Sequence, residues 1–157
     1  MPKIIFELQE FVGLIKRSPE NWRPLVFTNG CFDLIHVGHV RYLQSAKALG
    51  KTLVVGLNSD RSVQQLKGLS RPIVPEDQRA EVMAALKPVD AVIIFSETTA
   101  IEIIKAIAPD IYAKGGDYRI ETLPEAPTVN EYGGSIALIQ IEVLSSTSKI
   151  VQRIKSF

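Results

Sequence analysis

The sequence has very little cysteine and no long apolar run. Cys31 is the only cysteine among 157 residues, which excludes an internal disulfide and a cysteine-rich metal site; we expect it to pack as a small apolar residue. No apolar run approaches the length of a membrane span. Residues 1–22 mix acidic with apolar side chains and lack a small-residue cleavage site, so they do not indicate a signal peptide. These absences predict a cytoplasmic protein without a membrane segment.

An excess of charge of either sign is also missing. Eighteen basic and seventeen acidic residues leave a formal net charge of +1. This balance gives no overall positive field that would attract nucleic acid or an anionic membrane. The sequence also has no basic stripe of the kind typical of nucleic-acid-binding domains. Any binding of phosphate must therefore be local.

The length fits one domain with a real core. We expect a single domain over residues 1–157, in which residues 1–22 form an N-terminal helical extension and residues 25–157 form the core that carries the site. Apolar residues at steps of three and four predict an amphipathic helix over Lys3–Lys16.

Short runs rich in Val and Ile alternate with helical patterns along the rest of the chain. The runs show little polar alternation, which suits parallel strands buried on both faces. The expected strands are Leu25–Phe27, Leu53–Leu57, Ala91–Phe95, Ile111–Ala113 and Ile136–Ile141. The expected helices are His39–Leu49, Glu76–Leu86, Thr99–Ile107 and Thr147–Lys155. The alternation predicts an α/β fold: a Rossmann-like doubly wound parallel sheet of about five strands with an added N-terminal helix.

In such a fold, ligands bind beyond the carboxyl ends of the strands, where the strand order reverses. Residues that follow each strand are therefore the candidates for a site. Gln64–Pro75 and Tyr118–Gly134 are expected to be surface loops, and the second, with two prolines and a Gly-Gly pair, is expected to be mobile.

Both histidines of the chain stand in one short segment, TNGCFDLIHVGH, after the first of these strands. Thr28 to Gly30 predicts a tight turn, and His36 to His39 opens a helix. A helix start offers unpaired N–H groups and partial positive charge, which suit phosphate, and Gly38 lets a ligand approach the backbone. The alternatives are a pair of helix-capping histidines or metal ligands, although a turn that favours anions argues against a metal.

Two aspartates follow strands and have more than one interpretation. Asp60, in the segment Asn58 to Asp60, could accept hydrogen bonds from ribose or substrate hydroxyls, or it could cap the next helix. Asp33 could orient a histidine, help to hold Mg²⁺, or stabilise a turn.

Three cations come after the second strand, at Lys67, Arg71 and Arg79. Because arginine binds phosphate with a bidentate fork, Arg71 and Arg79 are the preferred contacts to substrate phosphates. Lys67 is the weaker candidate, since charged loop residues are commonly only solvated.

The segment KGGDY follows the fourth expected strand. Lys114 suits phosphate, Gly115 allows close approach of the backbone, and Asp117 suits a hydroxyl or a base-edge donor; a plain Gly-Gly turn is the alternative. Further along, Ser146, Thr147 and Ser148 begin the last helix and would form a second phosphate-binding helix start. An ordinary cap needs only one of these hydroxyls.

These motifs stand together in the order of a known family. NGCFDLIHVGH resembles the HxGH signature of the nucleotidyltransferase superfamily, in the form typical of cytidylyltransferase-like members. The likeness continues from Val26 onward through GLNSD, LKGLSRPIVPEDQR, KGGDY and SSTSKI. The set resembles the adenylyltransferase domain of bacterial heptose 1-phosphate metabolism, here as a free-standing chain.

The resemblance implies in-line attack by a substrate phosphate on the α-phosphate of ATP, with release of pyrophosphate. It implies D-glycero-D-manno-heptose 1-phosphate as the acceptor, ADP-heptose as the product, and Mg²⁺ bound with ATP. Such catalysis consists of positioning and charge neutralisation. A histidine of near-neutral pKa could become a cation beside a phosphate at modest cost.

The motifs and the resemblance together assign the site residues. The expected catalytic residues are His36, His39 and Lys114. The expected nucleotide contacts are Thr28, Asn29, Gly30, Phe32, Gly38, His39, Gly115, Asp117, Ser146, Thr147 and Ser148. The expected substrate contacts are Asp33, Asn58, Asp60, Lys67, Arg71 and Arg79, and Asp33 is the one candidate for direct contact with a metal.

One departure from the family pattern narrows the choice of nucleotide to be used as substrate. Cytidylyltransferases for glycerol phosphate or choline phosphate typically carry an arginine and an acidic residue before the serine/threonine cluster, in a pattern like RTEGIST. Residues 141–145, IEVLS, have no arginine, which favours ATP over CTP. The rival hypotheses are a cytidylyltransferase for an alcohol phosphate such as glycerol 3-phosphate and a non-catalytic nucleotide-binding module. A homodimer or higher homo-oligomer is expected.

Overall fold

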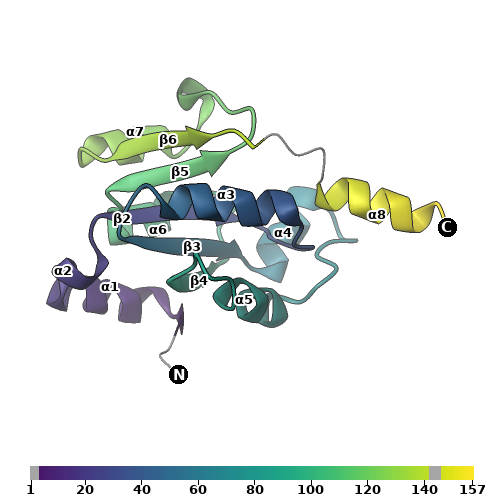
Figure 1. The fold of residues 1–157 in the computed structure, drawn as a ribbon, viewed down its shortest axis with the longest axis horizontal. Coiled ribbons are helices and arrows are strands. Elements are labelled where there is room, and N and C mark those ends of the chain that lie inside the picture. The colour runs from purple at the N-terminus through teal and green to yellow at the C-terminus, as the bar shows by residue number, and fades with distance from the viewer. Residues whose placement is uncertain (1–3, 142–145) are drawn as a thin grey trace.

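The structure is a computed structural model that describes residues 4–141 and 146–157. Most of the IEVLS stretch thus lies outside the described residues. One parallel sheet has the strand order β1-β4-β3-β2-β5-β6 (Figure 1). The strands are β1 (Ile5–Phe6), β2 (Leu25–Gly30), β3 (Thr52–Asn58), β4 (Ala91–Phe95), β5 (Ile111–Gly115) and β6 (Ser135–Ile139). The predicted Rossmann-like α/β fold is confirmed, with six strands in place of about five.

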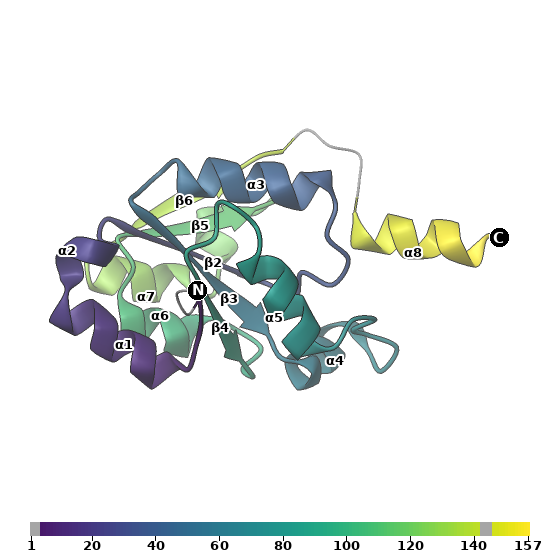
Figure 2. The same ribbon diagram turned by 60° about the horizontal axis from the view of Figure 1, so that its bottom comes forward.

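Helices cover both faces of the sheet. The helices of the described residues are α1 (Leu8–Arg17), α2 (Pro19–Trp22), α3 (Val37–Lys47), α4 (Asp60–Lys67), α5 (Glu76–Ala84), α6 (Ile101–Ile107), α7 (Ala126–Glu131) and α8 (Thr147–Lys155), with a 3₁₀ turn η1 (Ile120–Thr122). Helices α3 and α5 lie on one face, and α1, α6 and α7 lie on the other (Figure 2). In both views α8 extends away from the rest of the molecule.

Strand β3 shows why the strands lack polar alternation. Leu53, Val55 and Leu57 pack in the cluster under α3 and α5, whereas Val54 packs in the cluster under α1 and α6. Every residue of β3 is buried. Both faces of the sheet are therefore covered, as a parallel sheet requires.

The predicted helix over Lys3–Lys16 is wrong at its start. Ile5 and Phe6 form a short edge strand that pairs with Val92 and Ile93 of β4, and helix α1 begins only at Leu8. The apolar spacing fits a helix equally well, but pairing with the open edge of β4 decides the conformation.

The expected loops also contain regular structure. Tyr118–Gly134 includes η1 and α7; Leu123 is buried, and Val129 packs in the core cluster with strand residues. The start of Gln64–Pro75 is the last turn of α4. Within the two described ranges, no helix has the length and hydropathy needed to cross a membrane.

We propose that the N-terminal extension and the core unfold as one unit, because Phe11 of α1 is fully buried and shares a cluster with Leu25 and Phe27 of β2. Phe11 also packs edge-on to Trp22, with ring centroids 4.7 Å apart.

Phe11→Ala is expected to lower the free energy of unfolding by about 3–5 kcal/mol, the usual result of deleting a buried phenyl ring. The transition should stay single, since the deleted ring belongs to the common core. Urea unfolding followed by circular dichroism measures both quantities, and a separate low-stability transition would contradict the one-unit proposal.

Candidate active site

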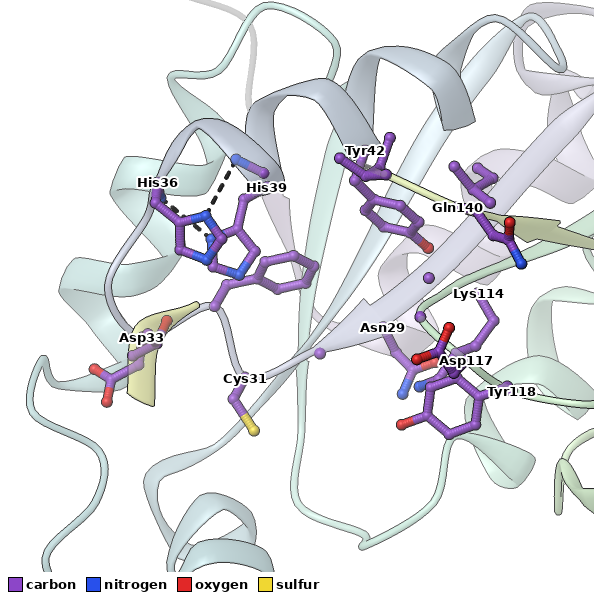
Figure 3. A pocket seen from close by; sticks show the side chains of 18 of the residues that line it. Asn29, Cys31, Asp33, His36, His39, Tyr42, Lys114, Asp117, Tyr118 and Gln140 are labelled. Carbon is purple, nitrogen blue, oxygen red and sulfur yellow. Dashed lines mark hydrogen bonds between the residues drawn. The ribbon is translucent and has the colours of Figure 1, made fainter. Parts of the chain in front are cut away.

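The carboxyl ends of β2 and β5 mark the point where the strand order reverses. From β2 the sheet extends through β3 to β4 on one side, and β5 then pairs with the opposite side of β2. The segments that leave β2 and β5 diverge, which opens a crevice between them. A pocket of about 550 Å³ lies in this crevice (Figure 3), a size that suits a small-molecule ligand.

Most of the expected site residues lie around this pocket. Those that line it are Asn29, Gly30, Phe32, Asp33, His36, Gly38, His39, Lys67, Lys114, Gly115, Asp117 and Thr147. Those expected but absent from the lining are Thr28, Asn58, Asp60, Arg71, Arg79, Ser146 and Ser148. Those that line it without having been expected are Cys31, Tyr42, Gly116, Tyr118, Ile139, Gln140 and Ile141. The structure therefore brings together residues from both ends of the chain.

The two histidines cap helix α3 with their own rings. His36 is the N-cap residue, and its Nδ1 accepts a hydrogen bond from the N–H of Gly38 at 3.1 Å. The Nδ1 of His39 accepts from the N–H of His36 at 3.3 Å. An accepting imidazole nitrogen carries no proton, so each neutral ring carries its proton on Nε2. The histidines can therefore cap the helix and still donate to a ligand. The cap occupies Nδ1 and so fixes the tautomer in which the Nε2–H is available.

Both imidazoles are neutral at pH 7 in this pocket. Burial, and then the adjacent His36 and Lys67, lower the pKa of His39 to about 4. Burial also lowers the pKa of His36. The two ring centroids are only 3.9 Å apart, so two positive charges there would repel each other. The histidines consequently act as neutral hydrogen-bond donors before any anion binds, and not as ready cations.

Phe32 supports His39 from an uncommon backbone conformation. Its φ is 45°, in the left-handed region that aromatic residues seldom occupy. Its buried ring packs edge-on to His39, with centroids 5.5 Å apart. A Cβ on Gly30 would lie 3.0 Å from the same ring, so glycine leaves room for Phe32. Strained residues of this kind gather at functional sites.

Two lysines supply the positive charge of the lining. Lys114 leaves the end of β5, across the pocket from the histidines (Figure 3). Burial lowers the pKa of its ammonium, and the carboxylate of Glu125 opposes that shift. The Nζ of Lys114 lies 5.2 Å from the ring centroid of Tyr118, within the range of a cation–π contact. Lys67, the last residue of α4, lines the same pocket, so the weaker sequence candidate is the better placed one.

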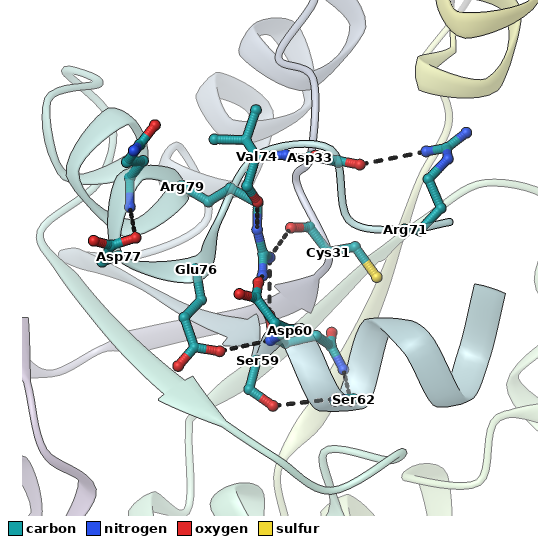
Figure 4. Close-up of polar contacts among 12 residues, drawn as sticks. Cys31, Asp33, Ser59, Asp60, Ser62, Arg71, Val74, Glu76, Asp77 and Arg79 are labelled. Atoms are coloured by element: carbon teal, nitrogen blue, oxygen red, sulfur yellow. Dashed lines mark hydrogen bonds and ion pairs between the residues drawn. The ribbon is translucent and has the colours of Figure 1, made fainter. Parts of the chain in front are cut away.

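Arg79 differs most from its expected place. Its guanidinium is buried and donates to the carbonyl oxygens of Val74, Cys31 and Asn58 and to Oδ1 of Asp60, at 2.6–2.8 Å (Figure 4). These bonds join the ends of β2 and β3 to α5. The structure thus assigns Arg79 to the framework behind the pocket and not to a substrate phosphate.

Asn58 and Asp60 also face this framework. The Nδ2 of Asn58 donates to the hydroxyl of Ser62 at 2.8 Å, and Asp60 pairs with Arg79. The N-cap of α4 is Ser59, whose Oγ accepts from the N–H of Ser62, so the capping interpretation of Asp60 is wrong. Neither residue reaches the pocket lining.

Asp33 holds the loop before α5. Its buried carboxylate accepts hydrogen bonds from the N–H groups of Ile73 and Val74, both at 2.9 Å, and pairs with Arg71 at 3.4 Å (Figure 4). The carboxylate thus stabilises a loop 40 residues away along the chain, and not a local turn of its own as the sequence alternative had it. In the part of the chain that the structure describes, no three or more His, Cys, Asp or Glu side chains are grouped to hold a metal ion.

The serine/threonine cluster fastens α8. The Oγ of Ser146 accepts from the N–H of Lys149 at 3.1 Å, as an N-cap. The hydroxyl of Thr147 donates to the carbonyl oxygen of Leu34 at 2.9 Å, and Ser148 is exposed. Of the three, only Thr147 lines the pocket.

Sequence reasoning missed two tyrosines, of which Tyr112 is fully buried and Tyr42 is partly buried. The hydroxyl oxygen of Tyr42 lies 2.6 Å from Oγ1 of Thr28, and the hydroxyl of Tyr112 donates to Oδ1 of Asn29 at 2.6 Å. Burial raises the pKa of both tyrosines. The only sequence signal was the spacing of Tyr42, which follows His39 by three residues on the same helix face.

Comparison with known proteins places the chain in a family. Residues 27–154 match the family model described as cytidylyltransferase-like. The chain belongs to the cytidylyltransferase-like family. The resemblance carried by the motifs is thereby confirmed at the level of the family.

Relatives of this cytidylyltransferase-like chain include bifunctional proteins named HldE. The chain is 51% identical over 141 residues to HldE of Methylobacillus flagellatus, and this aligned region covers 87% of this chain and 29% of the relative. It is 49% identical over 152 residues to HldE of Citrifermentans bemidjiense, and this aligned region covers 97% of this chain and 31% of the relative. The chain thus spans about three tenths of the length of these relatives.

Solved structures share the fold of this family member. The lipopolysaccharide core biosynthesis protein from Thermoplasma volcanium is 31% identical, with a TM-score of 0.61 over 76% of this chain and 97% of that one. Pantoate-beta-alanine ligase from Francisella tularensis has a TM-score of 0.63 over 99% of this chain and 79% of that one at 14% identity. The second likeness shows the fold alone.

We expect the ring of His39 to titrate at about 4 in the ligand-free protein. This folded-state pKa lies below the unfolded value of about 6.5, so between these pH values the unfolded state takes up a proton that the folded state does not. The stability should therefore fall as the pH drops through this window. NMR titration of the ring resonances measures the pKa, and urea unfolding at both ends of the window measures the stability. A His39 pKa of about 6.5 or higher would contradict the neutral pair.

Arg79→Met should lower the free energy of unfolding by about 3 kcal/mol, because a carboxylate and three carbonyl oxygens lose a buried charged donor. Lys67→Met is the matched control: it removes an exposed cation at the pocket and should change the stability by less than about 0.5 kcal/mol. Urea unfolding compares the two variants. Equal stabilities would rule out the framework assignment of Arg79.

Proposed function

We propose that this chain is an adenylyltransferase that joins ATP to a sugar 1-phosphate, with D-glycero-D-manno-heptose 1-phosphate as the acceptor. The observation that carries the proposal is the pocket between β2 and β5, in which His36 and His39, with Nδ1 engaged in the cap, lie across from Lys114 (Figure 3). The motif resemblance supports the choice of ATP and heptose, and the similarity to HldE proteins and to a lipopolysaccharide core biosynthesis protein is consistent with it.

In the proposed reaction, an acceptor phosphate oxygen attacks the α-phosphorus of ATP, and the bond from that phosphorus to the bridging oxygen breaks. Pyrophosphate takes the electron pair of this bond and leaves. His36 and His39 donate from Nε2 to oxygens of the α-phosphate, while Lys114 and Lys67 neutralise phosphate charge. Donors fixed before the reaction stabilise the developing charge without reorganising. The acceptor phosphate is already ionised at pH 7, so no side chain has to remove a proton from it.

We further propose that Mg²⁺ enters with the phosphates of ATP. Asp33 is a poor ligand, because its oxygens already accept backbone hydrogen bonds, so the coordination comes from phosphate oxygens and water. Bound Mg²⁺ would neutralise part of the triphosphate charge. We also propose a cytoplasmic location, since a lone cysteine fits a reducing compartment. The homo-oligomer stays a prediction.

The test of the function is pyrophosphate release with Mg²⁺, in which ATP and CTP are each paired with heptose 1-phosphate, glycerol 3-phosphate and other phosphorylated acceptors. Release with ATP and the heptose alone is the expected result. Release with CTP and an alcohol phosphate would overturn the substrates and keep the mechanism. Tight nucleotide binding without release from any pair would indicate a non-catalytic module.

His39→Ala should lower kcat by at least about a hundredfold, the usual effect of removing a transition-state donor, with much less effect on nucleotide binding. His39→Asn separates this donor from the cap, because the amide oxygen can replace Nδ1 while the Nε2–H is lost. Both variants should fall alike in steady-state pyrophosphate release. Full activity in His39→Asn would assign the histidine to capping alone.

A further inference from the structure

We propose that Tyr42 is a positioning residue, which fixes the histidines of α3 opposite Lys114 by joining α3 to both central strands through one hydroxyl. The inference rests on the proposed adenylyl transfer. Tyr42 lies outside the HxGH motif and was given no part in the reaction above.

The hydroxyl of Tyr42 lies where the central ladder ends. Strands β2 and β5 pair at Val26 with Ile111 and at Phe27 with Tyr112, and their pairing stops there. The next residues along the two strands are Thr28 and Ala113. The hydroxyl of Tyr42 contacts both: it donates to the carbonyl oxygen of Ala113 at 3.1 Å and lies 2.6 Å from Oγ1 of Thr28. The hydroxyl of Tyr42 thus links the first unpaired residues of β2 and β5, where the backbone hydrogen bonds of the ladder have ended.

These contacts fix the direction of each hydrogen bond. The proton of Tyr42 is directed to the Ala113 carbonyl, which can only accept, so the hydroxyl of Thr28 donates to the oxygen of Tyr42. Thr28 is fully buried, and its hydroxyl therefore depends on this partner. The result is a chain of two hydrogen bonds from β2 through α3 to β5.

The ring of Tyr42 also sets the distance between α3 and β5. A Cβ on Gly115 would lie 2.9 Å from this ring, so the ring packs directly on the backbone that follows Lys114. Tyr42 and His39 are three residues apart on α3 and share a face of the helix. A shift of the tyrosine is consequently passed on to the catalytic ring.

The phenol itself has no acid–base part in the reaction. Burial raises the pKa of Tyr42 to about 12, although the hydrogen bond from Thr28 opposes the shift. The hydroxyl stays protonated at neutral pH and both of its hydrogen bonds are directed into the protein. The ring of Tyr42 lines the pocket, but its hydroxyl is turned away, so the contribution of the hydroxyl to turnover must come through the placement of other groups.

The deciding variant is Tyr42→Phe, which keeps the ring and deletes both hydrogen bonds. We expect kcat for pyrophosphate release to fall by about tenfold or more, with KM for ATP changed by less than about threefold, because small errors in alignment reduce turnover more than binding. Tyr132→Phe is the matched control. Its hydroxyl donates to the carbonyl oxygen of Pro109 at 2.9 Å, away from the pocket, and burial raises its pKa to about 12 as well.

The control separates positioning from stability. Both variants lose a tyrosine hydrogen bond to a backbone carbonyl, which should lower Tm by a few degrees. Tyr42→Phe also leaves the buried hydroxyl of Thr28 without this partner, so its Tm should fall further. Only Tyr42→Phe should lower kcat. Thr28→Val removes the other partner, and the double variant Thr28→Val/Tyr42→Phe should be no slower than the slower single variant, since both changes break one link. A wild-type kcat in Tyr42→Phe overturns the proposal.

A second readout does not need turnover. If the wild-type protein releases no pyrophosphate from any pair, the proposed function fails, and the ring of His39 then tests the positioning. Loosening α3 should let water reach this ring and raise its pKa from about 4 toward the ordinary value in Tyr42→Phe, while Tyr132→Phe leaves it unchanged. In that case a shift supports the positioning role, and an unchanged His39 pKa overturns it.

Discussion

Strand β2 pairs unequally with its two neighbours, and the site depends on that inequality. Its ladder with β3 runs from Leu25 to Gly30, whereas its ladder with β5 ends at Phe27. The backbones of β2 and β5 separate beyond that residue, and the pocket begins there. Helix α3 leaves β2 through the segment that contains His36, and Lys114 stands near the end of β5. The histidines and Lys114 lie across the pocket from each other because they belong to the two sides of one opening.

The division of positive charge follows from the chemistry of the side chains. Arginine has a planar fork with five donors, which can satisfy several fixed carbonyl oxygens at once; Arg79 does this behind the pocket. Lysine has a flexible stem and a compact ammonium, which can follow a ligand. Lys67 and Lys114 accordingly line the opening. The guanidinium of Arg79 is therefore engaged within the protein, whereas the ammonium groups of Lys67 and Lys114 line the pocket.

The sequence predicted the parallel sheet well, because buried Val and Ile runs between helical patterns have few other solutions. It also predicted most of the residues that line the pocket, since HVGH follows β2 and KGGDY begins in the last residues of β5, the neighbouring strand. It failed where a distant contact decides the outcome. Ile5–Phe6 fits a helix until the edge of β4 is present, and α7 is hidden by the prolines and glycines around it. The charge of Arg79 can be read from the sequence, but its burial cannot.

Sequence reasoning also ranked the phosphate contacts by residue type, which favoured the arginines over Lys67. Figure 4 shows why this ranking does not fit Arg79: the acceptors that hold it come from the residue after β2, the end of β3 and the loop before α5. Tyr42 was overlooked for a similar reason, because its carbonyl partner is 71 residues away along the chain. Interactions between groups so far apart are set by the completed fold.

Because the two histidines are neutral in the ligand-free pocket, they can take up a proton when an anion binds. A phosphate placed against His39 favours the protonated ring, so it raises a pKa that burial, the adjacent His36 and Lys67 have lowered. A proton taken up in this way comes from the solvent, and the affinity for a polyanion then increases as the pH falls. The enthalpy measured for such binding would include the heat of ionisation of the buffer that supplies the proton.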